Sequence, residues 1–145
     1  MTDHDLGLEA IVRRLDDERQ IHNLLARLSH LADRGSIDDY LALWTDDGMW
    51  EGSADVARGK EEMRARVEAY RARGVQGPGS QARHVSTTRF VEFDTADSAR
   101  AESYFIYFVD VNTQPRPARV GRYVDELQRR DGQWRLHRRR LTLAD

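Results

Sequence analysis

The hydrophobic periodicity of this chain changes near His84, and that change limits the folds that the sequence can adopt. From Glu9 to Ala32, apolar residues recur every three or four positions, which is the spacing of an amphipathic helix. Beyond His84, the segments are rich in Val, Phe, Tyr and Thr and alternate with period two, which is typical of β-strands. Helices followed by a run of strands predict an α+β fold, with helices on one face of an antiparallel or mixed sheet. Because such a sheet twists strongly, it can curve around the N-terminal helices as a cone-shaped barrel with an open mouth.

Turn and capping residues divide the chain into shorter elements. Gly35 fits the end of the first helix, and Ser36 fits the N-cap of a second helix, with Asp39 three residues later. The other expected elements are a second helix over 37–44, a turn over 45–48, a strand over 49–52, a third helix over 59–74, a loop over 75–82, and strands over 84–93, 98–111, 118–130 and 133–144.

Composition limits the class of protein. The chain has 145 residues, of which 39% are hydrophobic and 33% are charged, so we expect a single globular domain over residues 1–145, with a flexible N-terminus over residues 1–8. A net charge of -2 gives no general attraction to nucleic acid or to an anionic membrane. The N-terminal residues lack the features of a signal peptide, and no apolar run approaches the ~20 residues of a membrane span. We therefore expect a cytoplasmic protein that binds neither nucleic acid nor membranes.

Cofactor motifs are missing from the sequence. The sequence contains 0 cysteines, which excludes a thiolate metal site. No histidine has a second ligand at a metal-binding spacing. Neither a glycine-rich dinucleotide motif nor a P-loop is present. The sequence thus predicts no metal and no other cofactor.

His84 is the histidine best placed for chemistry, because it begins a strand directly after a glycine-rich loop. Strict alternation puts it on one face with Ser86 and Phe90, and puts Val91 on the other face. Histidine is the side chain best suited to proton transfer near neutral pH. The plain alternative is a histidine at a strand end with ordinary hydrogen bonds.

Asp33 stands at the end of the first helix, just before Gly35. A helix C-terminus carries partial negative charge, so a carboxylate there is unfavourable unless something compensates for it. Asp33 is therefore either exposed to solvent or bound to a partner elsewhere in the chain.

Three segments resemble the SnoaL-like family of the nuclear-transport-factor-two-like superfamily. They are the segment from DERQIHNLL to MWEG, the segment RHVSTTRFVEFDTADSARAESYFIYF, and the segment GRYVDELQRRDGQWRLHRRRLTL. Their order and spacing resemble the subgroup that includes scytalone dehydratase, bile acid 7α-dehydratase, hexachlorocyclohexane dehydrochlorinase and the small subunits of ring-hydroxylating dioxygenases. The resemblance covers residues 9–143.

The resemblance implies a site. In the lyases of that subgroup, an Asp after the first helix orients a His on the strand after the loop, and Asp33 and His84 match those positions. Arg139 matches an active-site arginine, and Leu28 stands where the lyases often have a Lys or Tyr, so a helper acid or cation is missing there. Tyr104 matches a position that has a polar pocket residue in several members. Tyr40, Trp44 and Trp50 match positions in the walls or the floor of the cavity.

The resemblance implies two classes of function. The first is a cofactor-independent lyase of the dehydratase type, or an isomerase or cyclase, acting on a hydrophobic cyclic or polycyclic molecule through an Asp–His general-base dyad. The second is a non-catalytic ligand-binding protein or a structural subunit like the small subunits of the dioxygenases. In either case the resemblance implies a homo-oligomer, either a trimer or a dimer.

Overall fold

A six-stranded sheet and three helices make up the part of the protein that the computed structural model describes, residues 7–143. The helices are α1 (Leu8–Arg34), α2 (Ile37–Ala42) and α3 (Gly59–Ala72). The strands are β1 (Trp44–Glu51), β2 (Val56–Arg58), β3 (Arg83–Phe93), β4 (Ser98–Val109), β5 (Arg116–Arg130) and β6 (Gln133–Thr142).

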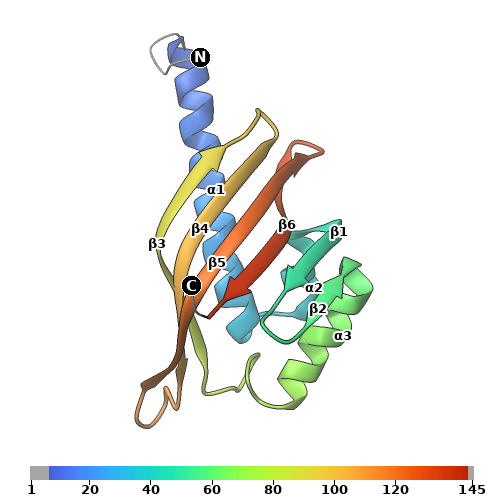
Figure 1. Ribbon diagram of the computed structural model, residues 1–145, viewed down its shortest axis with the longest axis vertical. Helices are drawn as coiled ribbons and strands as arrows, with labels where there is room; N and C mark the ends of the chain where they lie inside the picture. Colours follow the sequence, from blue (N-terminus) through green and yellow to red (C-terminus); the bar gives the residue numbers. More distant parts are fainter. Residues whose placement is uncertain (1–6, 144–145) are drawn as a thin grey trace.

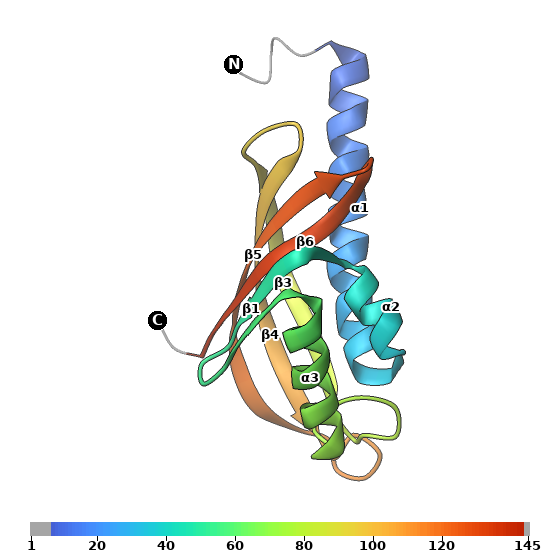
Figure 2. The same cartoon turned by 90° about the vertical axis from the view of Figure 1, so that its right-hand side faces the viewer.

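The sheet is mixed and curved, and the helices lie on its concave side (Figures 1 and 2). The strand order is β2-β1-β6-β5-β4-β3, with β1 and β6 parallel and the other neighbours antiparallel. The α+β class and the curvature around the helices are confirmed. The sheet does not close into a full barrel, because β2 and β3 remain two separate edges.

The core forms where α1 crosses the sheet. One stripe of α1, comprising Ile21, Leu24, Leu25 and Leu28, is buried in the same apolar cluster as Trp44. The stripe was expected to begin earlier, but Ile11 and Leu15 are 38% and 60% exposed. They lie on the N-terminal part of α1, which extends beyond the end of the sheet (Figure 2). Helical spacing therefore predicts the buried face of α1 correctly, but it does not predict how much of the helix is covered by the sheet.

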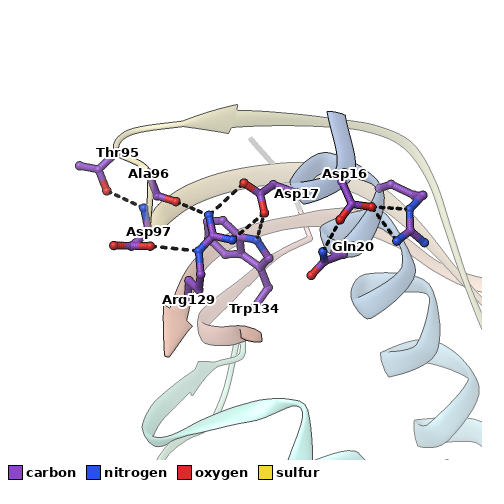
Figure 3. A network of polar contacts seen from close by, with 9 residues as sticks. Asp16, Asp17, Gln20, Thr95, Ala96, Asp97, Arg129 and Trp134 are labelled. Atoms are coloured by element: carbon purple, nitrogen blue, oxygen red, sulfur yellow. Dashed lines mark hydrogen bonds and ion pairs between the residues drawn. The ribbon is translucent and has the colours of Figure 1, made fainter. Parts of the chain in front are cut away.

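A network of hydrogen bonds and ion pairs joins α1 to the end of the sheet that carries the β3–β4 turn (Figure 3). Asp17 of α1 accepts hydrogen bonds from Arg129 of β5 at 2.7 and 2.9 Å and from the indole of Trp134 on β6 at 3.0 Å. Arg129 also donates to Asp97 and to the carbonyl of Ala96, in the turn between β3 and β4. Asp17 and Arg129 together thus join the helix, two strands and a hairpin turn.

The helix ends follow the expected capping chemistry. Ser36 accepts a hydrogen bond from the Asp39 amide at 3.0 Å, which confirms the predicted N-cap of α2. Gly35 ends α1 in an extended conformation. A Cβ at Gly35 would lie 2.4 Å from Leu31 Cδ2, so a glycine lets the chain turn back tightly against the helix. This turn places Asp33 and Tyr40 at the same end of the sheet.

Several expected bounds are wrong. The turn expected over 45–48 lies inside β1, which begins at Trp44 and contains a register irregularity before Met49. The short strand β2 was not expected, and Ala42 ends α2. Of the flexible N-terminus expected over residues 1–8, residues 1–6 lie outside the described residues and Leu8 already belongs to α1, while the expected strand end at residue 144 is also outside them. Among the helices described, none has the length and apolar character needed to cross a bilayer.

Candidate active site

Two bulges decide which side chains face the concave side of the sheet. On β3, the register with β4 shifts between Thr87 and Phe90, and Thr88 has a φ of 49°. On β6, the register with β5 leaves His137 as the extra residue. Each bulge resets the alternation of the strand, as an extra residue does. The strict alternation expected for β3 is therefore wrong beyond the bulge, where Phe90 is 51% exposed and Val91 packs against the core.

A cavity of about 360 Å³ lies between the helices and the concave face of the sheet. All three helices and strands from both sides of the sheet contribute to its wall. The lining residues that matter here are Leu28 of α1, Tyr40 of α2, Trp50 of β1, Asp55, Arg66, Tyr70 and Arg73 in and beside α3, His84 of β3, Tyr107 of β4, Arg119 and Tyr123 of β5, and Arg139 of β6.

Asp33 and His84 are in direct contact in this wall. Asp33 Oδ1 lies 2.6 Å from His84 Nδ1, and Asp33 Oδ2 accepts the His84 backbone N–H at 3.0 Å. A carboxylate only accepts hydrogen bonds, so the proton of this contact sits on Nδ1. The Asp33 side chain is 6% exposed and lies behind the ring, while His84 lines the cavity. The two N–H groups supply the compensation that a carboxylate at a helix C-terminus needs.

Tyr107 holds the other side of the His84 ring. The two ring centroids are 5.0 Å apart at an angle of 48°, and the Tyr107 hydroxyl donates to the Val75 carbonyl at 2.7 Å. Burial, with a further contribution from the negative charge of Asp33, raises the pKa of Tyr107. The tyrosine therefore stays neutral and fixes the ring between Asp33 and the loop that precedes β3.

A buried ion pair forms the floor of the cavity. Arg139 donates from Nε and Nη2 to Asp125 at 2.7 and 2.8 Å, and its guanidinium carbon lies 3.9 Å from the centroid of the Tyr123 ring. Burial alone would disfavour the charged arginine, but the attraction of Asp125 outweighs it and raises the pKa of Arg139. Burial raises the pKa of Tyr123 to about 12. The floor is thus a fixed cation beside a neutral phenol.

A second arginine lies between aromatic rings on the α3 side. The guanidinium carbon of Arg66 is 4.0 Å from the Trp50 ring centroid and 4.3 Å from that of Tyr70. Its Nε donates to Asp55 Oδ2 at 2.6 Å, and its side chain is 14% exposed. Among the described residues, the buried indole N–H of Trp50 has no hydrogen-bond partner.

The cavity contains most of the residues expected from the sequence. His84, Leu28, Tyr40, Trp50 and Arg139 line it, and Asp33 lies behind His84. Arg139 reaches the inner face because the bulge at His137 places it on the same side as Leu136.

Two expected pocket residues need correction. Tyr104 is 54% exposed and lies on the convex face, because inward side chains of β4 are those at odd positions, such as Phe105 and Tyr107. Trp44 is 1% exposed and belongs to the core cluster below α1, not to the cavity wall. Tyr107 therefore occupies the place that was expected for Tyr104.

Several wall residues had no signal in the sequence. Arg66 and Tyr70 belong to a helix whose arginine-rich face is typical of a solvated surface, and Asp55 lies in a short connection. Asp125 had one usable signal: it is an acidic residue between Tyr123 and Leu127 on the inward-facing side of β5, and buried carboxylates are almost always paired. Throughout residues 7–143, no three His, Cys, Asp or Glu side chains gather in a way that could hold a metal ion.

The sequence itself matches the model of the SnoaL-like domain over residues 13–140. The chain belongs to the SnoaL-like family. Among proteins of curated function, none matches this SnoaL-like chain in sequence.

Solved structures similar to this SnoaL-like protein share its NTF2-like fold. An NTF2-like protein with a cystatin-like fold from Novosphingobium aromaticivorans aligns over 100% of this chain and 93% of its own, with a TM-score of 0.83 and 26% identity. A scytalone dehydratase-like protein from the same organism covers 93% of this chain and 89% of its own, with a TM-score of 0.77 and 19% identity. LinA covers 92% of this chain and 90% of its own, with a TM-score of 0.76 and 19% identity.

Proposed function

We propose that this SnoaL-like protein is a cofactor-independent lyase that eliminates water from a hydrophobic cyclic or polycyclic molecule, with His84 as general base. The observation that carries the proposal is the 2.6 Å contact between Asp33 Oδ1 and His84 Nδ1 in the wall of the cavity. The contact fixes the tautomer, because a proton on Nδ1 leaves Nε2 with its lone pair. Likeness to a scytalone dehydratase-like protein and to LinA supports the choice of reaction class.

The proposed step balances within the substrate. His84 Nε2 removes a proton from the carbon next to a carbonyl, and the electron pair of that C–H bond forms a carbon–carbon double bond. The C–O bond on the neighbouring carbon breaks, and the hydroxide leaves as water with the proton that His84 returns. Asp33 stabilises the imidazolium that exists between the two events, as a buried carboxylate does beside a catalytic histidine.

The walls of the cavity suit a flat apolar ring system. Leu28, Phe105 and Leu141 supply aliphatic and aromatic surface, while Tyr40 and Arg139 supply polar groups at the floor. Ligand sites of this kind are mostly apolar and have few polar groups that fix orientation. An isomerisation or a cyclisation would use the same proton transfer to His84, so both stay within this proposal as variants of it.

The test uses 3-hydroxy-1-tetralone, a cyclic β-hydroxy ketone that loses water to give the fluorescent 1-naphthol. We expect the wild type to accelerate the dehydration and His84→Asn to lose about 10²–10⁴-fold of that rate, the range for one general base. His30→Asn is the matched control, because His30 is exposed and its ring contacts Arg34, away from the cavity wall. Equal rates in the wild type and His84→Asn would contradict the proposal and favour the ligand-binding alternative.

A further inference from the structure

We infer that Arg66 and the indole N–H of Trp50 form an anion-binding subsite in the same cavity, and that the natural ligand carries a carboxylate on its apolar ring system. The inference deepens the proposed function and rests on it only for the ring system, since the subsite can bind a carboxylate without any catalysis.

The first support is the free hydrogen-bonding capacity of Arg66. Its Nε donates to Asp55, and within the described part of the chain neither of its terminal Nη groups has a hydrogen-bond acceptor. The guanidinium is held between Trp50 and Tyr70 at 4.0 and 4.3 Å, so its orientation is fixed before any ligand arrives. A stacked arginine with free terminal N–H groups is suited to bidentate binding of a carboxylate.

The second support is the indole N–H of Trp50, which is buried and unpartnered in this part of the structure. A buried donor without an acceptor costs free energy comparable to a lost hydrogen bond, so a ligand oxygen there removes a cost that the empty site carries. Gly52 leaves space beside this donor, because a Cβ at that position would lie 2.9 Å from Trp50 Nε1 and 2.3 Å from Asp55 Oδ1. A ligand oxygen on this side of the indole N–H would therefore lie close to Asp55 as well.

The third support is the excess of cationic groups around the cavity. Four arginines line it, namely Arg66, Arg73, Arg119 and Arg139, and Asp55 is the one carboxylate among the lining residues. Asp125 neutralises Arg139 from behind, and Asp33 is committed to His84. The lining therefore favours an anion, although the whole chain has a net charge of -2. A neutral ring ketone would gain nothing from this excess.

The subsite lies across the cavity from the base. Trp50 belongs to β1 and Arg66 to α3, whereas His84 belongs to β3, and β1 and β3 stand near opposite edges of the sheet. The curvature of the sheet brings both groups to the same cavity. A carboxylate bound by Arg66 would fix one end of the ligand while its reacting carbon faces His84.

The test compares naphthoate with naphthamide, which have the same rings but differ in charge, by titration calorimetry. We expect the wild type to prefer naphthoate, and Arg66→Gln to weaken naphthoate about 10- to 100-fold, as expected for hydrogen bonds to a charged group, with naphthamide little changed. Arg73→Gln is the matched control, because it removes the same charge at the C-cap of the same helix, from an exposed residue that also lines the cavity, and should weaken naphthoate only slightly. Trp50→Phe should weaken both ligands.

Asp55→Asn separates a binding role from a structural one. Asn keeps an oxygen that can accept the Arg66 Nε hydrogen bond but removes the competing negative charge, so naphthoate should bind more tightly than to the wild type. If Arg66 only anchors α3, Arg66→Gln and Asp55→Asn would leave the preference for naphthoate unchanged or lower the binding of both ligands alike, and the inference would be wrong. His30→Asn, at an exposed residue away from the cavity, should bind naphthoate as the wild type does. Binding with that pattern but no dehydration would refute the proposed function and leave the subsite standing.

Discussion

Asp33 Oδ1 lies 2.6 Å from Nδ1 of His84, which is 51 residues further along the chain. The same carboxylate also accepts the backbone N–H of His84, so it fixes both the position of β3 and the orientation of the ring. The contact therefore joins the end of α1 to the first residues of an edge strand. Its chemical consequence is that the ring nitrogen not facing Asp33 is available to a ligand in the cavity.

Replacing Asp33 with Asn should change the tautomer of His84. In the wild type the neutral ring should carry its proton on Nδ1, because only a donor satisfies the carboxylate. The Asn amide can instead donate to Nδ1 and move the proton to Nε2. Nitrogen NMR of the ring, at a pH where it is neutral, measures the two forms. Asp39→Asn, at an exposed residue of α2, should leave the His84 signals unchanged, and an unchanged tautomer in Asp33→Asn would show that Asp33 does not control the ring.

Asp17→Asn should destabilise the protein at neutral pH. Burial of Asp17 favours its neutral form, but the hydrogen bonds from Arg129 and Trp134 outweigh it and lower its pKa. A lowered pKa in the folded state contributes stability above the unfolded pKa of Asp, and this stability is lost as the pH falls through the folded pKa. We expect a loss of about 1.5–3 kcal/mol in the free energy of unfolding, the range for hydrogen bonds to a charged group.

Urea unfolding at neutral and acidic pH measures this effect. The difference between the wild type and Asp17→Asn should shrink at low pH, where the wild-type carboxyl is also protonated. Asp97→Asn is the control, since Asp97 contacts the same arginine but its side chain is 71% exposed. It should cost at most about 1 kcal/mol, as exposed ion pairs do. Equal losses in the two variants would contradict the assigned role of Asp17.

Tyr123 should make the protein less stable in alkaline solution. Its pKa is raised to about 12 by burial, so the unfolded chain ionises this phenol earlier than the folded one. Stability is fully present below the unfolded pKa near 10 and is lost as the pH rises toward the folded value. Two pKa units correspond to roughly 3 kcal/mol. Unfolding of Tyr123→Phe should show a weaker loss between these two pH values, and a parallel loss in both proteins would refute the assignment.

Gly121→Ala should displace the aromatic wall of the cavity. A Cβ at Gly121 would lie 2.5 Å from Phe105 Cε1 and 2.5 Å from the Thr142 carbonyl, so the ring or β6 must move. Overpacking of this kind costs about 1–3 kcal/mol. Thermal unfolding measures the loss, and Val56→Ala, at a strand position that is 47% exposed, should change stability by less than about 0.5 kcal/mol. Wild-type stability of Gly121→Ala would show that the wall can yield.

The homo-oligomer that the family resemblance implies stays a prediction, and the convex face of the sheet is where to test it. Val85, Ile106 and Val120 stand side by side on β3, β4 and β5, and Val85 and Val120 are 42% and 59% exposed. Light scattering should give the mass of a dimer or trimer, and Val120→Arg should lower it because a buried charge opposes association. A monomeric wild type would refute the expectation.

Much of the fold could be predicted from local signals. The stripe of α1, the cap at Ser36 and the tight turns between strands depend on neighbouring residues, and the structure contains them. The pairing of β1 with β6 could not be predicted, because a parallel contact between distant segments has no local signature. The shortness of β2 and the exposed start of α1 depend on where the sheet ends, which is a property of the whole fold.

The site residues that match family positions could be predicted from the sequence. Those whose place depends on the three-dimensional fold could not. The resemblance paired Asp33 with His84 and pointed to Arg139, and the structure places all three at the cavity or directly behind it. Tyr104 was wrong because the choice between it and Tyr107 depends on which face of β4 is concave. Arg66 was missed because an arginine on a helix is usually exposed to solvent. Only the folded structure places the rings of Trp50 and Tyr70 against it.

The bulges at Thr88 and His137 suggest how a cavity of this kind changes its chemistry over time. Each is one residue long, and each determines which half of its strand faces inward. Deleting one residue would replace Arg139 by its neighbour in the floor, or would exchange the inward and outward side chains along β3. Single-residue insertions and deletions, more than point substitutions, are therefore the events by which such a scaffold can acquire a new set of lining groups in one step.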